Sequence, residues 1–429
     1  MDYQQAIAFH EKAKAYGSIL GLSNIRRLMY ELKDVWKTLS IIHVAGTNGK
    51  GSVCCFLASM LKEAGYRVGQ YNSPAVFSQR EIYRINGEEI TREDYASCME
   101  KVKSACEALV ERGEPHPTVF EIETALAFQW FYERKCDFVI LEVGMGGSTD
   151  ATNVIEKPLC SVFTSISRDH MKYLGDSIGD IAKIKSGIIK EGCPVISTVQ
   201  REEAASVIRL CAEEKHAPYY LAASLGQGRV FQGIRYARHP DFGEIKISML
   251  GRYQLDNSAL ALEVISVLKE RGEIEISLEE IRRGIFGALW QGRFECVSNE
   301  PLFYLDGAHN LDGAIKLKET LMENFPDKKK IGIMGVMEDK EYSKIIEVLG
   351  PLFFQIYTVT PDNPRSLPGE TLAREIKRQG MAGDFVPEIG EAVGLAYSLA
   401  LKEDAMVMVF GSLYYLSEVK EALHDFTGD

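Results

Sequence analysis

A glycine-rich turn that carries a lysine follows an apolar run near the start of the chain. The run is Ile41–Ala45, the turn is Gly46-Thr47-Asn48-Gly49, and Lys50-Gly51-Ser52 leads into an apolar helical pattern. Backbone N–H groups at a helix N-terminus attract phosphate, and glycines let the backbone approach it closely. Lys50 adds positive charge, and the Ser52 hydroxyl suits a magnesium ion. The segment therefore predicts a nucleotide phosphate site, with a plain strand-to-helix turn as the alternative.

Two further polar clusters follow apolar runs that predict strands. Glu142 directly follows the run 138–141, and Asp169-His170 stands a few residues beyond the run 159–164. Ligands of open parallel sheets lie beyond the carboxyl ends of the strands, so one site could use all three segments. The alternatives are a capping or surface role for the Glu142 carboxylate and a structural role for His170, because a lone histidine is more often structural than a ligand.

The elements that must position these segments alternate short β-branched runs with helical stretches, which is typical of an α/β fold. An apolar helical stretch over 53–64 ends at Gly65. We expect a doubly wound N-terminal domain that carries the phosphate loop, and a smaller, Rossmann-like α/β C-terminal domain. Further strands are predicted in the second half of the chain, at residues 303–305, 331–335, 355–359 and 406–410.

The domain boundary is expected where the sequence turns polar and reaches a proline, at 296–301. Residues 1–296 would form the first domain and residues 297–429 the second. The intervening stretch 218–248 contains Gly and Arg residues and predicts short strands, as a hairpin region of the first domain. At roughly 150 residues per domain, a chain of this length allows two or three domains.

The composition is that of an ordinary globular protein. The 429 residues are 46% hydrophobic and 26% charged, which excludes a disordered, collagen-like or small disulfide-rich chain. With 49 Lys and Arg against 61 Asp and Glu, the net charge is −12, so broad nucleic-acid binding is not expected. An anionic substrate would need positive charge supplied locally, as Lys50 supplies it.

Cysteine usage and hydropathy bear on the compartment. Nine cysteines are scattered without CxxC spacing, which indicates free thiols in a reducing cytosol. The N-terminus has no basic and apolar leader pattern, and no apolar run approaches about 18 residues. We therefore expect a cytoplasmic protein without a membrane partner.

The phosphate loop departs from the generic pattern in a specific way, because position 44 is Val and Gly51 separates the lysine from the hydroxyl residue. The sequence Gly-Thr-Asn-Gly-Lys-Gly-Ser resembles the phosphate loop of the folylpolyglutamate synthase and dihydrofolate synthase family, within the Mur ligase superfamily. Any one such motif is moderately specific, but several together are very specific. Other segments resemble the family in its order and extend over nearly the whole chain: 141–153, 169–175, 181–188, 292–295, 305–310, 363–365 and 411–414.

The resemblance implies an ATP-dependent ligase that joins L-glutamate to the γ-carboxylate of a folate through an acyl phosphate. It also implies an ATP- and folate-binding first domain, a glutamate ligase second domain, Mg²⁺ as cofactor with a monovalent cation as a further candidate, and a monomer. Dihydrofolate synthase, which uses dihydropteroate, remains open as the sole or a second activity. A cell-wall Mur enzyme, a P-loop NTPase that does not ligate, and a binding module without catalysis are less favoured alternatives.

The resemblance also assigns metal and catalytic roles. It implies that Ser73, Glu142 and His170 hold metal, with Ser52 beside the phosphates, and that Lys185 is carbamylated to bind a second Mg²⁺. Without the resemblance, the sequence around Lys185 would place it on a solvated helix face, since other lysines lie close by in the sequence. The implied catalytic residues are Lys50, Glu142, His170 and Lys185.

Nucleotide binding is implied for both domains. Besides the phosphate-loop residues 48–52, the resemblance implies contacts from Asn257, Arg293 and Asp306, with His309 near the ribose or the glutamate. A helix cap is the alternative role for Asn257, and an interdomain salt bridge for Arg293. Domain closure during the reaction is expected, since it would protect an acyl phosphate from water.

Folate binding is implied for Thr118, Phe120 and Glu121, where an aromatic ring could stack on a flat heterocycle. The alternative for Phe120 is a core residue at a helix start. The loop after Ser73 departs from the family, which often has Ser-Pro-His-Leu followed by Glu-Arg-Ile. Here Ala75 replaces the histidine and Arg80 precedes Glu81, so the folate contact of this loop is expected to differ.

Overall fold

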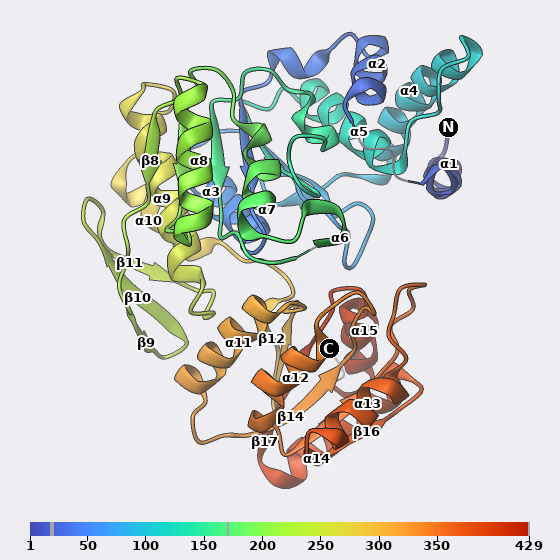
Figure 1. Ribbon diagram of the computed structural model, residues 1–429, viewed down its shortest axis with the longest axis vertical. Coiled ribbons are helices and arrows are strands. Elements are labelled where there is room, and N and C mark those ends of the chain that lie inside the picture. Colours follow the sequence, from blue (N-terminus) through green and yellow to red (C-terminus); the bar gives the residue numbers. More distant parts are fainter. Residues whose placement is uncertain (18–20, 170, 428–429) are drawn as a thin grey trace. The chain divides into compact units, whose positions relative to one another are not determined.

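The computed structural model describes residues 1–17, 21–169 and 171–427 and divides into two compact units (Figure 1). Unit 1 consists of Met1–Gln227, Ala237–Lys246 and Asp256–Ala288. Unit 2 consists of Gly228–Tyr236, Ile247–Leu255 and Leu289–Asp429. Each unit is a layered α/β structure built on its own sheet.

The sheet of unit 1 has eight strands in the order β4-β3-β2-β5-β1-β6-β7-β8. Six of them are parallel and two form an antiparallel edge, because β3 pairs antiparallel with both β2 and β4. The parallel strands are β1 (Ile41–Ala45), β2 (Val68–Tyr71), β5 (Phe138–Glu142), β6 (Cys160–Phe163), β7 (Val195–Ser197) and β8 (Tyr219–Leu221), and the edge strands are β3 (Tyr83–Ile85) and β4 (Glu88–Glu89).

Helices of unit 1 cover this sheet, whose central strands are buried along their whole length and largely apolar. One buried cluster joins α1, α2, α4 and α5 to β1, β2 and β5, and a second joins α7 and α8 to β1, β6 and β7. Another helix pair, α3 and α10, packs together. The bounds are α1 (Tyr3–Ala13), α2 (Ser23–Glu31), α3 (Lys50–Glu63), α4 (Arg92–Glu111), α5 (Val119–Glu133), α6 (Met171–Leu174), α7 (Ile178–Lys185), α8 (Glu202–Glu214), α9 (Gln254–Glu270) and α10 (Leu278–Gly287).

Unit 2 has a six-stranded sheet in the order β12-β13-β17-β14-β15-β16, in which only the edge strand β12 is antiparallel to its neighbour. The strands are β12 (Arg293–Asn299), β13 (Leu302–Asp306), β14 (Lys329–Met334), β15 (Gln355–Thr358), β16 (Gly383–Phe385) and β17 (Ala405–Phe410). The helices are α11 (Leu311–Asn324), α12 (Tyr342–Leu349), α13 (Gly369–Arg378), α14 (Ile389–Glu403) and α15 (Leu416–Thr427).

A third, small sheet lies where the chain passes between the units. It has the order β11-β10-β9, formed by β9 (Arg229–Phe231), β10 (Ile234–His239) and β11 (Gly243–Ile247). The short strands predicted in 218–248 are therefore present. They do not belong to the first domain alone, because residues 228–236 are part of unit 2.

The α/β class with a large sheet and a smaller second sheet is confirmed, and so are the strands predicted at 41–45 and 406–410. The division of the chain is less simple than a boundary at 296/297. The last passage between the units falls after Ala288, and the polar stretch 296–301 is the end of β12 and the turn into β13. An edge strand is polar because it has a neighbour on one side only.

All nine cysteines are among the described residues and none forms a disulfide, as the sequence predicts. In the part of the chain that the structure describes, no helix is both long enough and apolar enough to span a bilayer.

Candidate active site

The phosphate loop joins β1 to α3 and needs two of its glycines for steric reasons. Gly46 has φ +151° and Gly49 has φ +92°, both in a region that side chains rarely allow. A Cβ atom at Gly46 would lie 1.8 Å from Thr164 Oγ1, and one at Gly49 would lie 2.3 Å from Asn257 Oδ1. The loop is therefore packed closely against β6 and α9. Asn257, which was predicted to bind ATP, lies beside this loop.

The first half of the loop is fixed to the segment after β6. The N–H groups of Thr47 and Asn48 donate to the Ser165 carbonyl at 2.8 and 3.3 Å, and Thr47 Oγ1 donates to the Ser167 carbonyl at 3.1 Å. The second half opens α3, whose first-turn N–H groups have no acceptor within the helix itself. The helix begins at Lys50, three residues earlier than predicted, so the lysine stands at the positive end of the helix.

Lys50 and Glu142 lie close together at the ends of neighbouring strands. β1 and β5 pair in parallel, with Val44 opposite Glu142, so the loop after β1 passes the end of β5. Lys50 Nζ lies 3.3 Å from the Thr47 carbonyl oxygen and 3.8 Å from Glu142 Oε1. Glu142 is 5% exposed, so its carboxylate is a buried charge and not the surface group of the alternative interpretation.

Lys185 reaches the same loop from α7. It is the last residue of that helix and is buried, and its Nζ donates to the Gly46 carbonyl at 2.7 Å. Burial lowers the pKa of Lys185 to about 7, and the positive charge of Lys50 acts in the same direction. The interpretation of Lys185 as part of a solvated face is wrong. Of Lys183 and Lys185, only Lys183 is exposed, because positions two residues apart on a helix point in directions that differ by about 200°.

The second signature segment, 141–153, fixes the end of α7. Ser148 N–H donates to the Ile184 carbonyl at 2.9 Å, and Asn153 Nδ2 donates to the Ser148 and Gly187 carbonyls at 3.2 and 3.1 Å. A Cβ atom at Gly147 would lie 2.7 Å from the Lys185 carbonyl oxygen. The glycines of this segment therefore allow the close approach that brings Lys185 to the phosphate loop.

A buried polar chain beneath this segment was missed by the sequence analysis. Asp150 accepts from Met145 N–H at 2.8 Å and from Thr152 Oγ1 at 2.5 Å, and Thr152 Oγ1 in turn accepts from His43 Nε2 at 2.9 Å. Burial raises the pKa of Asp150 and lowers that of His43 to about 3. His43 Nδ1 is buried and has no hydrogen-bond partner. Its place within an apolar β-strand run gave the sequence no functional signal.

His43 makes the stability of the fold depend on pH. An unfolded chain takes up a proton near the ordinary pKa of 6.5, whereas folded His43 takes it up near 3. The unfolded state therefore binds more protons below pH 6.5, and stability falls as pH falls towards 3, by about 1.4 kcal/mol for each unit of pKa difference. We expect urea unfolding curves of His43→Leu to lose less free energy over this range than those of the wild type. Parallel losses in both proteins would contradict this.

The remaining predicted metal residues are placed only in part. Ser52 is buried in the first turn of α3, and Ser73 lies just beyond β2 and is partly exposed. His170 lies outside the described residues. Over the described ranges, no group of three or more His, Cys, Asp and Glu side chains could hold a metal ion. The buried carboxylate of Glu142 and the hydroxyl oxygens of Ser52 and Ser73 are nevertheless suitable ligands for Mg²⁺. This ion often binds one or two carboxylates together with substrate phosphates.

The predicted folate residues begin α5. Thr118 is the N-cap, and it forms a capping box with Glu121, whose Oε2 accepts from Thr118 N–H at 2.7 Å. Both side chains are buried by this local role. Phe120 is partly buried, and its ring lies so close to Gly144 that a Cβ atom there would be 2.6 Å away. Of the three, Phe120 is placed beside the second signature segment. Folate contact stays a prediction for all of them.

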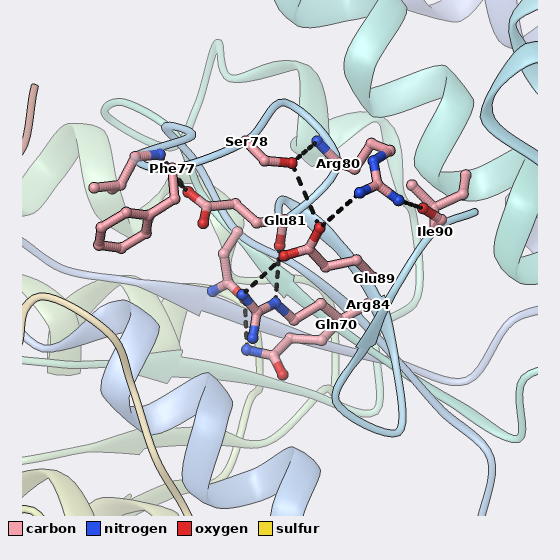
Figure 2. A network of polar contacts seen from close by, with 10 residues as sticks. Gln70, Phe77, Ser78, Arg80, Glu81, Arg84, Glu89 and Ile90 are labelled. Carbon is pink, nitrogen blue, oxygen red and sulfur yellow. Dashed lines mark hydrogen bonds and ion pairs between the residues drawn. The ribbon is translucent and has the colours of Figure 1, made fainter. Parts of the chain in front are cut away.

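The loop after Ser73 is held by its own side chains (Figure 2). Glu81 is buried and accepts from the N–H groups of Val76 and Phe77, the latter at 3.0 Å. Arg80 Nη1 donates to the Ile90 carbonyl at 3.0 Å, and its Nη2 lies 3.7 Å from Glu89. Arg80, the residue whose displacement marks the departure from the family, is thus engaged within the loop.

Three of the predicted nucleotide residues lie together in unit 2, around the end of β13. Asp306 is buried and accepts from Phe294 N–H at 2.9 Å and from Ala308 N–H at 2.8 Å. It stands opposite Arg293 in the register of β12 and β13, and His309 Nδ1 lies 2.7 Å from the Gly307 carbonyl oxygen. Burial raises the pKa of Asp306, while the charge of Arg293 opposes the rise.

Tyr253 completes this cluster and was not predicted. Its hydroxyl donates to Asp306 Oδ2 at 2.9 Å, and the side chain belongs to a unit 2 segment. Burial raises its pKa well above the ordinary value. Tyr253 lies four residues before Asn257, which is the residue of this stretch that the resemblance indicated.

The sequence matches two families of one superfamily. Residues 44–265 match the Mur ligase middle domain, and residues 292–413 match the Mur ligase glutamate ligase domain. Among curated proteins, the dihydrofolate synthase/folylpolyglutamate synthase of Bacillus subtilis is 36% identical over 98% of this chain and 99% of its own length. The folylpolyglutamate synthase of Lacticaseibacillus casei is 32% identical over 99% of both.

Solved structures agree with this. Folylpolyglutamate synthase of Mycobacterium tuberculosis, complexed with ADP and AMPPCP, matches with a TM-score of 0.89 and 26% identity over 100% of this chain and 99% of that one. Escherichia coli FolC in complex with DHPP and ADP matches with a TM-score of 0.85 and 28% identity over 98% of both. The chain therefore belongs to the folylpolyglutamate synthase/dihydrofolate synthase family of ATP-dependent Mur-type ligases.

Proposed function

We propose that this protein joins the amino group of L-glutamate to the γ-carboxylate of a reduced folate, and that ATP drives the reaction through an acyl phosphate. The observation that carries the proposal is the grouping of Lys50, Glu142 and Lys185 around the phosphate loop. The Lys50 cation and a helix N-terminus in a buried setting suit two reactants that are both anions, and Lys185 lies on the same loop with its pKa lowered to about 7. Full-length relatives with this named activity support the same conclusion.

The chemistry explains why such charges are needed. A carboxylate oxygen of the substrate attacks the γ-phosphorus of ATP, the bond to the β,γ-bridging oxygen breaks, and ADP leaves with that electron pair. The glutamate nitrogen then attacks the acyl carbon, loses a proton, and phosphate leaves. Both steps gather negative charge, which Lys50 and the first-turn N–H groups of α3 would stabilise. Magnesium would be held by Ser52, Ser73, Glu142 and His170, and by Lys185 once that lysine is carbamylated, and it would supply further charge neutralisation on the phosphates.

We further propose that the protein also has dihydrofolate synthase activity, which adds the first glutamate to dihydropteroate. The support is that the 36% identical relative from Bacillus subtilis carries both names, as do relatives from Mycobacterium tuberculosis and Buchnera aphidicola. The same acyl phosphate route serves both reactions, since each joins glutamate to a carboxylate on the same kind of molecule. The two activities therefore differ in the acceptor and not in the nucleotide chemistry.

Product analysis separates these functions. The protein is incubated with ATP, Mg²⁺ and glutamate, and with dihydropteroate or tetrahydrofolate in separate reactions, and the products are identified by mass spectrometry. We expect a glutamate adduct in both, with one ADP formed for each amide. An adduct with tetrahydrofolate alone would contradict the second activity. Phosphate release without any adduct would contradict ligation and favour a non-ligating NTPase.

A further inference from the structure

Asn72 lies against the carboxylate of Glu142, although none of the sequence motifs includes it. β2 and β5 are parallel neighbours with Tyr71 opposite Leu141, so the residues after each strand continue side by side. Asn72 Nδ2 donates to Glu142 Oε2 at 2.6 Å. Both side chains are buried, at 4% and 5% exposure, so this contact is shielded from water. A hydrogen bond to a charged group in such a place is a strong one.

The direction of this contact is fixed by chemistry. An ionised carboxylate can only accept, so the Asn72 amide must present its NH₂ group to Glu142 and its carbonyl oxygen away from it. That oxygen accepts from Gln70 Nε2 at 2.6 Å. Gln70 lies two residues earlier, within β2, and it is also 4% exposed. Two buried amides thus run in one direction towards Glu142.

The far end of this amide chain borders the loop that follows Ser73. Gln70 stands opposite Arg84 in the antiparallel pairing of β2 and β3, and Figure 2 shows their side chains together. Arg84 Nε donates to the Glu81 carbonyl at 3.1 Å, and Arg84 Nη2 lies 3.8 Å from Glu89. The series of hydrogen bonds from Gln70 through Asn72 to Glu142 therefore begins beside side chains that are themselves bonded. This restrains the orientation of the Gln70 amide.

We propose that Asn72, supported by Gln70, is a positioning residue that orients the Glu142 carboxylate for a divalent cation. Asn72 engages Oε2, and Oε1 is the oxygen on the side of Lys50 and the phosphate loop. The inference rests on the proposed function, because that function assigns the metal to Glu142. Partners behind a metal ligand commonly contribute about 10–100-fold to metal affinity.

The test replaces Asn72 by a residue of similar size that cannot donate, Asn72→Leu, and measures Mn²⁺ binding by electron paramagnetic resonance in the presence of AMPPCP. We expect the Kd for Mn²⁺ to rise about 10–100-fold. Gln70 does not contact Glu142 directly, so Gln70→Leu should also raise the Kd for Mn²⁺, but by a smaller factor. Gln129→Leu is the matched control, since Gln129 is also a buried amide bonded to a glutamate, Glu133, but within α5. It should bind Mn²⁺ as the wild type does.

Activity gives a second readout that a merely structural role would not produce. In Asn72→Leu, the Mg²⁺ concentration for half-maximal rate should rise, and saturating Mg²⁺ should restore most of kcat. An unchanged Kd for Mn²⁺ in a folded Asn72→Leu would overturn the proposal. If that variant does not fold, an unchanged Kd in Gln70→Leu would overturn it. A wild type that binds no Mn²⁺ with AMPPCP would instead contradict the metal role of the proposed function.

Discussion

Lys50→Met is expected to lower the rate of amide formation by about 10²–10³-fold at saturating ATP, because it removes a preorganised cation from the place where charge develops. Lys50 is the first residue of α3, and its Nζ lies 3.3 Å from the Thr47 carbonyl oxygen and 3.8 Å from Glu142 Oε1. Methionine keeps the length and much of the volume of the side chain but not the charge. Without Lys50, the negative charge of Glu142 would lose this neighbouring opposite charge and would repel the triphosphate. The affinity for ATP should therefore fall as well.

The matched control is Lys62→Met, in the last turn of the same helix, where the side chain is exposed. It changes the net charge of the protein equally and should leave the rate within a factor of two of the wild type. Coupled measurement of ADP and of the glutamate adduct checks both variants. Full ligation by Lys50→Met would contradict the proposed role of the phosphate loop.

How much of the site the sequence could predict depended on whether the signal was local. Lys50 and Glu142 each follow an apolar strand run, and the rule that parallel strands end at one edge brings them together. The structure places their side chains 3.8 Å apart, at the ends of strands that are neighbours in the sheet. Strand order was not needed for this prediction, because both residues lie at the same edge whatever the order.

Residues whose roles depend on contacts between distant parts of the chain were harder to predict from the sequence. Lys185 bonds a carbonyl 139 positions earlier, and Asn72 bonds a carboxylate 70 positions later. Nothing within a helical window tells which of two nearby lysines turns inwards, so the functional role of Lys185 was implied by the family resemblance and its burial was not predicted. Likewise, Asn72 and Tyr253 are single polar residues whose partners are identified only by the fold.

The elements of the fold likewise divide into those with a local sequence signal and those that depend on tertiary contacts. Buried runs such as Ile41–Ala45 and Ala405–Phe410 were recognisable because central parallel strands are apolar along most of their length. β12 was not, since an edge strand has polar positions that look like a linker. The assignment of residues 228–236 and 247–255 to unit 2 depends on tertiary contacts, among them Arg235 with Glu323 at 2.6 Å, which no local pattern indicates.

Carbamylation of Lys185 is the second prediction with a large expected effect, and its chemistry has a definite requirement. The amine nitrogen attacks CO₂ and loses a proton, which gives an anionic carbamate and H⁺. Only the neutral amine has the lone pair for this step. An ordinary lysine with a pKa of 10.5 is almost wholly protonated near pH 7, whereas the pKa of about 7 leaves roughly half of Lys185 neutral. The buried lysine is thus suited to react without a separate base.

Lys185→Arg is expected to lower ligation by about 10²–10³-fold, because arginine keeps the positive charge but cannot become a neutral amine or a carbamate at any ordinary pH. Lys183→Arg, on the same helix and exposed, should retain wild-type activity. In ¹³CO₂-labelled wild type we expect one carbamate carbon resonance that Lys185→Arg lacks and that fades below pH 6, where the amine is protonated. If Lys185→Arg ligates as fast as wild type, then only the charge of Lys185 matters, as in its present bond to the Gly46 carbonyl. Crystal density with ATP bound that showed an unmodified lysine would contradict carbamylation directly.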